Sequence, residues 1–182
     1  AIELVKTQLN IFDNEFSMRF QRNPIHNIES RIKTPQSIVG KLQRKGMPVT
    51  PESARNNLTD IAGVRVICCY IDDIYAIADS AFQLRKIKDY IKNPKPNGYR
   101  SFHMILDVPV YMSNGKEIAP VEIQIRTIAM DFWASLEHQL HYKSTGDPKI
   151  AASLTGELKE CSETISGIDQ KMQDMFKKIN LL

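Results

Sequence analysis

The sequence has no hydrophobic run long enough to cross a bilayer, and its longest apolar stretch, residues 64–71, contains an arginine. Its 3 cysteines form neither a CxxC pair nor a disulfide framework, because Cys68 and Cys69 are adjacent. We therefore expect a protein of the reducing cytoplasm without a membrane span. The net charge of +3 is too small to indicate DNA or RNA as a partner. It is compatible with a phosphate-rich small ligand.

Two familiar nucleotide-binding motifs are also missing. No GxxxxGK[ST] stretch is present, which excludes a P-loop enzyme, and no GxGxxG stretch supports a Rossmann cofactor site. The chain has 182 residues, of which 42% are hydrophobic and 25% charged, so its length and composition are those of an ordinary globular domain. Any phosphate chemistry must therefore rest on residues outside these two motifs.

Hydrophobic periodicity divides the chain into alternating helices and strands. Apolar residues at every third or fourth position predict helices over 1–22, 34–45, 72–84 and 127–142. Thr34 and Asp72 are expected to cap the second and the third of these helices. Alternating or β-branched runs predict strands over 28–33, 64–71, 87–91, 102–110 and 118–126. Asn114-Gly115 indicates a hairpin turn between the last two strands, and residues 48–57 and 93–100 are expected to be mainly loop. From Leu154 to Leu182 an a/d heptad pattern is typical of a helix that packs against another helix.

These elements predict an α/β (α+β) fold, in which a mixed sheet of about five strands has flanking helices and an amphipathic helix at each end. We expect an N-terminal helix over 1–27, a central unit over 28–145 and a C-terminal oligomerisation helix over 146–182. The terminal helices carry apolar stripes that must be buried, which predicts a homo-oligomer built through them. The alternative is a monomer in which the two terminal helices pack on each other.

Acidic and amide side chains occur where strands are predicted. Along 118–126, Glu122, Gln124 and Arg126 alternate with apolar residues and therefore share one face of the strand. An acid, an amide and a base in one row are unusual on a central strand, although the outer face of a hairpin would also accommodate them. Asp60 lies just before another strand, where a structural cap is the simpler interpretation.

Positive charge is concentrated on the helix over 34–45 and at its entry. Ser37, Lys41 and Arg44 fall on one helical face, and Lys33 lies just before the helix. The N-terminus of a helix attracts anions through its dipole and its free N–H groups. This arrangement predicts a phosphate site, although a solvated basic face is the commoner meaning of such a run.

Aromatic and imidazole side chains follow the turn sequence PKPNGYRSFH. Tyr99 comes directly after a glycine and is placed to stack on a nucleobase, although an exposed loop tyrosine is the plainer interpretation. In the helix predicted over 127–142, the apolar stripe that is expected in the core consists of Ala129, Phe132, Trp133, Leu136 and Leu140. The pair His138 and His141 has helical spacing for a metal, but no third ligand accompanies it.

An acid pair for a metal, several cations and a stacking aromatic together indicate phosphoryl-type transfer between nucleotides. The segments TDIAGVR, NGYRSFH, VEIQIRT and MDFWASLEHQLHYK resemble, in order and spacing, the synthetase domain of the RelA/SpoT homologues over about 28–145. The short chain is similar to the small alarmone synthetases of bacteria. The resemblance implies a nucleotidyltransferase-like fold and a homotetramer. It also implies transfer of the ATP pyrophosphate to the ribose 3′-hydroxyl of GDP or GTP, giving ppGpp or pppGpp and AMP.

The resemblance further assigns roles to individual residues. It implies that Asp60 and Glu122 hold Mg²⁺ and that Glu122 is also the base for the 3′-hydroxyl. Residues matching the ATP contacts are Arg31 and Arg65 at the adenine, and Lys33, Ser37, Lys41 and Arg44 at the phosphates. Residues matching the acceptor-nucleotide contacts are Lys88, Lys95, Tyr99, His103, Gln124 and Asp131. The competing hypothesis is a catalytically degenerate nucleotide-binding module that acts through partner or RNA binding. The presence of both Asp60 and Glu122 favours the enzyme.

Overall fold

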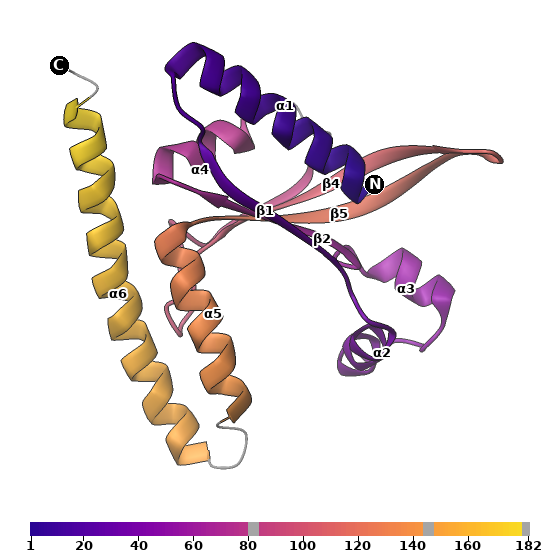
Figure 1. The fold of residues 1–182 in the computed structure, drawn as a ribbon. Helices are drawn as coiled ribbons and strands as arrows, with labels where there is room; N and C mark the ends of the chain where they lie inside the picture. Colours follow the sequence, from indigo (N-terminus) through magenta and orange to yellow (C-terminus); the bar gives the residue numbers. More distant parts are fainter. Residues whose placement is uncertain (80–83, 144–147, 180–182) are drawn as a thin grey trace.

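The structure is a computed structural model that describes residues 1–79, 84–143 and 148–179. Within these residues, five strands form one mixed sheet in the order β1-β2-β5-β4-β3 (Figure 1). Only β2 and β5 pair in parallel, and the other neighbours are antiparallel. The strands are β1 Ile25–Ile32, β2 Ala62–Cys68, β3 Leu84–Asp89, β4 Phe102–Met112 and β5 Gly115–Thr127. The mixed sheet with flanking helices confirms the predicted fold class.

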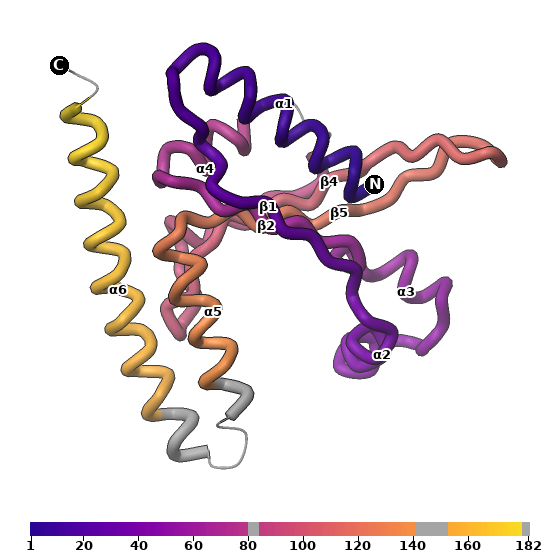
Figure 2. The backbone as a smooth tube through the Cα atoms, in the orientation of Figure 1, coloured from indigo at the N-terminus to yellow at the C-terminus, as the bar shows by residue number. Residues whose placement is uncertain are grey.

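Helices cover both faces of the sheet. They are α1 Ile2–Phe20, α2 Pro35–Arg44, α3 Pro51–Asn57, α4 Ile71–Ala78, α5 Ile128–Lys143 and α6 Pro148–Ile179. Figure 2 shows α1 and α4 on one side of the sheet, and α5 and the α2–α3 pair on the other side. Helix α6 begins beside α5 and continues past the end of the sheet to α4. Among the described residues, no helix combines the length and apolarity that a membrane span requires.

The main core lies between the sheet and the layer of α1 and α4. Val121, Ile123 and Ile125 of β5 are fully buried there, as their alternation predicts. Val5 and Leu9 of α1 belong to the same core. The N-terminal stripe is therefore buried within the chain, which corrects the expectation that it would face another subunit.

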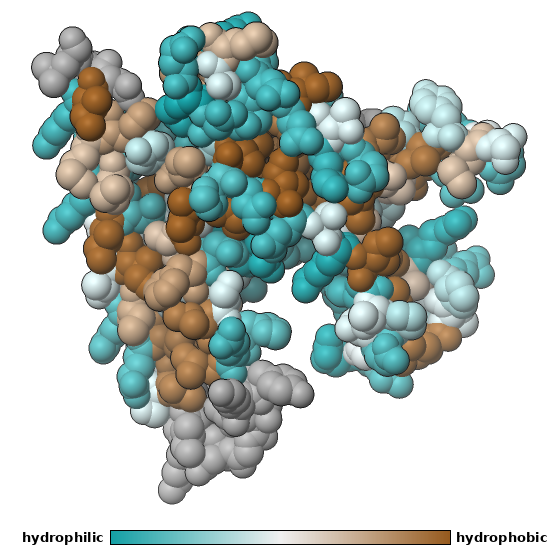
Figure 3. Space-filling view, in the orientation of Figure 1, coloured by the Kyte–Doolittle hydropathy of each residue, from teal (hydrophilic) through white to brown (hydrophobic). Residues whose placement is uncertain are grey.

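The other face of the sheet is polar. In Figure 3 hydrophilic side chains line the hollow between α5 and the α2–α3 pair. Glu122 and Gln124 point to this side because they alternate with the buried residues of β5. The fold thus leaves one polar sheet face open between two helical walls.

Several local boundaries differ from the predicted ones. Residues expected to be loop form α3, because Thr50 caps the backbone N–H of Ser53 and Pro51 follows at the first helical position. Helix α4 begins at Ile71 and is capped by Asp73, which accepts a hydrogen bond from Tyr70 N at 3.1 Å, so the expected cap at Asp72 is wrong. The end of the helix predicted over 72–84 is also wrong, because Leu84 begins β3; residues 80–83 lie outside the described part.

The inward face of α5 was predicted incorrectly. Phe132, Leu136 and Leu140 were expected in the core, yet Phe132 is 58% exposed and the other two are also exposed. The buried residues are instead Met130, Trp133 and Ala134. Trp133 was expected in the core, and this is confirmed. Helix α5 is apolar on two sides, so periodicity alone cannot tell which side meets the sheet.

Candidate active site

Two rows of side chains cross the polar face of the sheet. In one row Arg31, Gly63, Glu122, Ile105 and Lys86 are successive cross-strand partners. In the next row the partners are Glu29, Arg65, Gln124, His103 and Lys88. Because residues two apart on a strand share a face, both rows project into the same space. The register therefore gathers residues from all five strands at one place.

Asp60, just before β2, lies against two lysines. Its Oδ2 atom contacts Nζ of both Lys33, which lies just before α2, and Lys41, which lies in the last turn of α2. Burial alone would raise the pKa of Asp60, but the hydrogen bonds and charges of the two lysines outweigh it and lower the pKa. Its Oδ1 atom is buried without a hydrogen-bond partner. One side of this ionised carboxylate is thus free for a ligand.

Glu122 sits at the end of a chain of hydrogen bonds. Arg126 Nη2 donates to Tyr99 Oη at 2.7 Å, and Tyr99 Oη lies 2.9 Å from His103 Nε2. Since the tyrosine oxygen already accepts from arginine, its own proton points to the imidazole, which places the imidazole proton on Nδ1. That nitrogen lies 3.3 Å from Glu122 Oε1.

The same contacts govern the ionisation of Glu122. Burial tends to raise the pKa of its carboxyl group, but the hydrogen bonds from His103 and Gln124 lower it below the ordinary value. Gln124 Nε2 donates to the second carboxylate oxygen at 3.2 Å. Glu122 is therefore a carboxylate at neutral pH and able to accept a proton.

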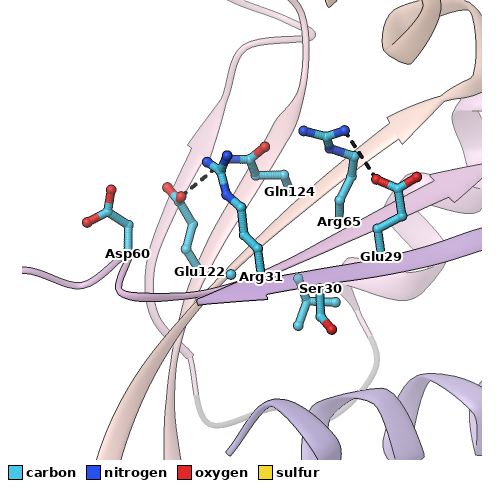
Figure 4. A pocket seen from close by; sticks show the side chains of 9 residues that line it. Glu29, Ser30, Arg31, Asp60, Arg65, Glu122 and Gln124 are labelled. Carbon is cyan, nitrogen blue, oxygen red and sulfur yellow. Dashed lines mark hydrogen bonds and ion pairs between the residues drawn. The ribbon is translucent and has the colours of Figure 1, made fainter. Parts of the chain in front are cut away.

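Among the described residues, two hollows on this face share a wall. The smaller, of about 70 Å³, is lined by Asp60 and Glu29, among others. Figure 4 shows Arg31, Glu122 and Gln124 close together in it. The larger, of about 640 Å³, extends to Lys95 and Tyr99. Residues lining both are Arg31, Arg65, Glu122 and Gln124. Glu122 thus lies on the border between the two hollows.

Arg31 and Arg65 stand on neighbouring strands above the smaller hollow (Figure 4). Gly63 lies beside Arg31 in the register, and a Cβ atom there would lie 3.8 Å from Arg31 Cγ. Arg65 Nη1 is 3.3 Å from Glu29 Oε2 and 3.6 Å from Asp131 Oδ1. Two guanidinium groups on one side of a sheet provide planar surfaces for a purine.

The remaining predicted residues are distributed over the two hollows and α2. Lys88, Lys95, Tyr99 and His103 line the larger hollow. Ser37 lies in the first turn of α2, where it bonds Thr34. Asp131 reaches Arg126 and Arg65 from α5 rather than lining either hollow. Arg44 lies one turn past Lys41, exposed.

Arg126 is a site residue that the sequence prediction left out. It is 5% exposed and holds Tyr99, Gln124 and Asp131 together through its guanidinium. Its place in the polar row of β5 was the signal that pointed to it. Tyr99 and Asp131 lie outside β5, so the strand pattern alone could not show that Arg126 contacts them.

The sequence of this chain is similar to those of known proteins. The family described as the region found in RelA and SpoT proteins matches residues 30–147. The protein named GTP pyrophosphokinase YwaC, from Bacillus subtilis, is 44% identical over 185 residues, covering 99% of this chain and 87% of the relative.

Two crystal structures have the same architecture. Small alarmone synthetase 2 from Bacillus subtilis is 46% identical with a TM-score of 0.85, covering 98% of this chain and 94% of that one. Small alarmone synthetase 1 from Bacillus subtilis, bound to its product pppGpp, is 33% identical with a TM-score of 0.86, covering 98% and 92%. The similarity therefore extends through both terminal helices.

Proposed function

The chain belongs to the RelA/SpoT family and is a GTP pyrophosphokinase, and we propose that the two hollows are its nucleotide sites. Such an enzyme moves the pyrophosphate of ATP to the ribose 3′-hydroxyl of GDP or GTP and releases AMP. The observation that carries the assignment is the position of Glu122 on the border shared by both hollows. A base at this border reaches an acceptor hydroxyl on one side and a donor phosphate on the other. The three cysteines form no disulfide bond among the described residues, which is consistent with the reducing cytoplasm as the proposed location of the enzyme.

ATP is assigned to the smaller hollow. Arg31 and Arg65 would hold the adenine between their guanidinium planes. Lys33 and Lys41 lie at the adjoining end of the site, where they neutralise Asp60. When ATP binds, its phosphates would form ion pairs with these two ammonium groups. Ser37 in the first turn of α2 and Arg44 one turn beyond Lys41 would extend the phosphate contacts.

The residues fit a magnesium ion that arrives with the nucleotide. Asp60 Oδ1 is a buried carboxylate oxygen without a partner, and the negative charge of Asp60 acts on Glu122. Within the described residues no group of three or more acidic, histidine or cysteine side chains stands ready for a metal. Two carboxylates completed by substrate phosphates are a usual Mg²⁺ environment. Such an ion would neutralise charge on the transferred phosphates.

The transfer is an in-line displacement at the β-phosphorus of ATP. The 3′-oxygen of the acceptor forms a bond to this phosphorus, and the bond to the oxygen bridging the α-phosphorus breaks, so that oxygen leaves with AMP. Glu122 accepts the hydroxyl proton, because its lowered pKa keeps it ionised. His103 orients the carboxylate through its hydrogen bond.

The larger hollow would bind the guanine nucleotide. Tyr99 offers a ring for the guanine, and the cations Lys88 and Lys95 lie along the same hollow for the acceptor phosphates. Gln124 and His103 would contact the ribose end. Asp131 bonds Arg126, which in turn holds Tyr99, so Asp131 would act in guanine recognition through this anchor.

A product assay tests the assignment. Wild-type protein incubated with ATP, Mg²⁺ and GDP, GTP or GMP should form AMP with GDP and GTP. Adenine nucleotides in place of the guanine acceptor serve as the control and should give little AMP. Absence of AMP with every guanine nucleotide would contradict the enzyme and favour a binding module.

The ionisation of Glu122 predicts the acid limb of the pH profile. Because its pKa lies below the ordinary value of a glutamate, the loss of kcat/KM that protonation of Glu122 causes should begin only at a pH below the ordinary range for a glutamate. Replacing His103 by Ala removes a bond that lowers this pKa while burial still raises it, so the acid limb should move to higher pH. His103→Asn retains a donor near the place of Nδ1 and should move the limb less. Equal profiles for the three proteins would contradict the role of His103.

We further propose that a second copy covers an apolar band on α5 and α6, in a homotetramer. Figure 3 shows hydrophobic surface along α5 and the neighbouring part of α6. The exposed large apolar residues are Ile128, Phe132, Leu136 and Leu140 on α5, and Ile168, Met172, Met175 and Ile179 on α6. An apolar band on two adjoining helices is typical of an interface between protein subunits. This supports the C-terminal half of the predicted interface.

Light scattering of paired variants tests the assembly. Met172→Asp introduces a charge in the band and should lower the mass below that of the wild type. Gln170→Asp introduces the same charge about 200° around α6 and should leave the mass unchanged. A wild-type mass near 20.8 kDa would contradict the assembly.

A further inference from the structure

Helix α6 touches the loop that carries Tyr99. Ser162 of α6 is 4% exposed, and its Oγ donates a hydrogen bond to the carbonyl oxygen of Gly98 at 2.5 Å. Gly98 has a φ of 91°, a conformation that favours glycine. A Cβ atom on Gly98 would lie 2.6 Å from Ser162 Cβ and 3.1 Å from Lys159 Cα. The loop backbone therefore contacts the helix directly. A residue other than glycine at position 98 would strain the backbone and would also clash with the helix.

The loop transmits this contact to Tyr99. Lys95 N donates to Tyr99 O at 3.2 Å and Gly98 N to Lys95 O at 2.8 Å, which closes a tight turn. Tyr99 N donates to the side chain of Asn97, which in turn donates to Glu137 of α5 at 3.2 Å. The carbonyl held by Ser162 immediately precedes Tyr99 in the chain. Ser162 therefore holds the backbone directly before Tyr99.

Helix α6 is also held in place by hydrogen bonds that do not involve the loop. Thr127 Oγ1 donates to the buried Asp169 at 2.6 Å, and Trp133 Nε1 donates to Leu158 O at 2.9 Å. Near the other end, Gln173 exchanges hydrogen bonds with Asp72. These polar contacts set the position of α6 against α4, α5 and β5. The helix can therefore act as a fixed support for the loop.

We propose that α6 positions Tyr99 for the acceptor nucleotide and that Ser162 is a positioning residue of the pyrophosphokinase reaction. The inference rests on the proposed assignment of the larger hollow to the guanine nucleotide. It gives the C-terminal helix a second role beside the interface, because the side of α6 that meets the loop carries Ser162 whereas the exposed side carries Met172. Acceptor binding is thereby linked to the docking of α6, while ATP binding is independent of it.

Removing one hydroxyl group tests this link. Ser162→Ala deletes the bond to Gly98 and should raise the KM for GDP about three- to tenfold, the usual range for one buried hydrogen bond, with the KM for ATP unchanged. Thr164→Ala is the matched control, since Thr164 Oγ1 bonds Glu160 O of its own helix at 3.1 Å and is exposed. The control should leave both KM values unchanged.

Two measurements separate positioning from general destabilisation. Calorimetric titration of Ser162→Ala should show weaker binding of GDP and unaltered binding of a non-hydrolysable ATP analogue. Hydrogen exchange of the Gly98 and Tyr99 amides should become faster in Ser162→Ala and not in Thr164→Ala, while exchange in β5 stays slow. Because exchange is read site by site, this measurement remains valid if Ser162→Ala is less stable.

The outcomes distinguish this inference from the proposed function. An active wild type whose GDP binding is weakened by Tyr99→Ala but not by Ser162→Ala overturns the positioning role alone. Equal losses for GDP and ATP in Ser162→Ala overturn it as well. A wild type that binds no guanine nucleotide overturns the site assignment on which the inference rests.

Discussion

Glu122→Gln is expected to lower kcat by about two to four orders of magnitude, the usual range for loss of a general base. The amide cannot accept the 3′-hydroxyl proton and is a poor magnesium ligand. It has the size of the carboxylate, and its oxygen can still accept a hydrogen bond from His103 Nδ1. Binding of both nucleotides, measured by calorimetry, should therefore stay close to that of the wild type.

Glu29→Gln is the matched control for this prediction. Glu29 lines the smaller hollow on the same sheet face, but it does not line the larger hollow and its side chain is 54% exposed. The same chemical change there should alter kcat only slightly. Turnover near that of the wild type in Glu122→Gln, or equal losses in both variants, would remove Glu122 from the mechanism.

Tyr99→Ala should raise the KM for the guanine nucleotide far more than that for ATP. Loss of a stacking ring costs about 1–3 kcal/mol per base, which corresponds to roughly five- to 150-fold in affinity. Tyr99→Phe keeps the ring and loses only the bonds of the hydroxyl to Arg126 and His103, so its effect should be smaller. Steady-state kinetics with each substrate varied in turn measures both constants.

Arg65→Ala provides the reciprocal test, since it should weaken ATP more than the guanine nucleotide. Arg65 lies on the wall shared by the hollows, whereas Tyr99 lies only in the larger one. Weakening of the same nucleotide by Arg65→Ala and Tyr99→Ala would show that the two sites have been assigned incorrectly.

Features set by neighbouring residues were predictable from the sequence. The alternation along β5 correctly separated Glu122 and Gln124 from the buried residues, because strand side chains change face at every position. Thr34 was correctly expected to cap α2, and its hydroxyl oxygen accepts a hydrogen bond from Ser37 N at 3.3 Å. The hairpin at Asn114-Gly115 likewise appears between β4 and β5.

Features set by distant parts of the chain were not predictable in this way. Lys33 and Lys41 were expected to meet phosphates, but their contact with one oxygen of Asp60 depends on how the end of β1 and α2 lie beside β2. The anchoring role of Arg126 and the support of Gly98 by Ser162 join residues 5 to 64 positions apart. Periodicity reports which face is apolar, and it cannot report which partner covers that face.

The central claim is that a pyrophosphate, rather than a single phosphate, passes between two nucleotides bound on either side of Glu122. Parallel reactions with GDP and ATP labelled at either the α- or the γ-phosphorus test it most directly. The predicted result is γ-label in the guanine product and α-label in AMP, with the two products formed in equal amounts. Appearance of the α-label in ADP, or of the γ-label in inorganic phosphate without a labelled guanine product, would contradict the account.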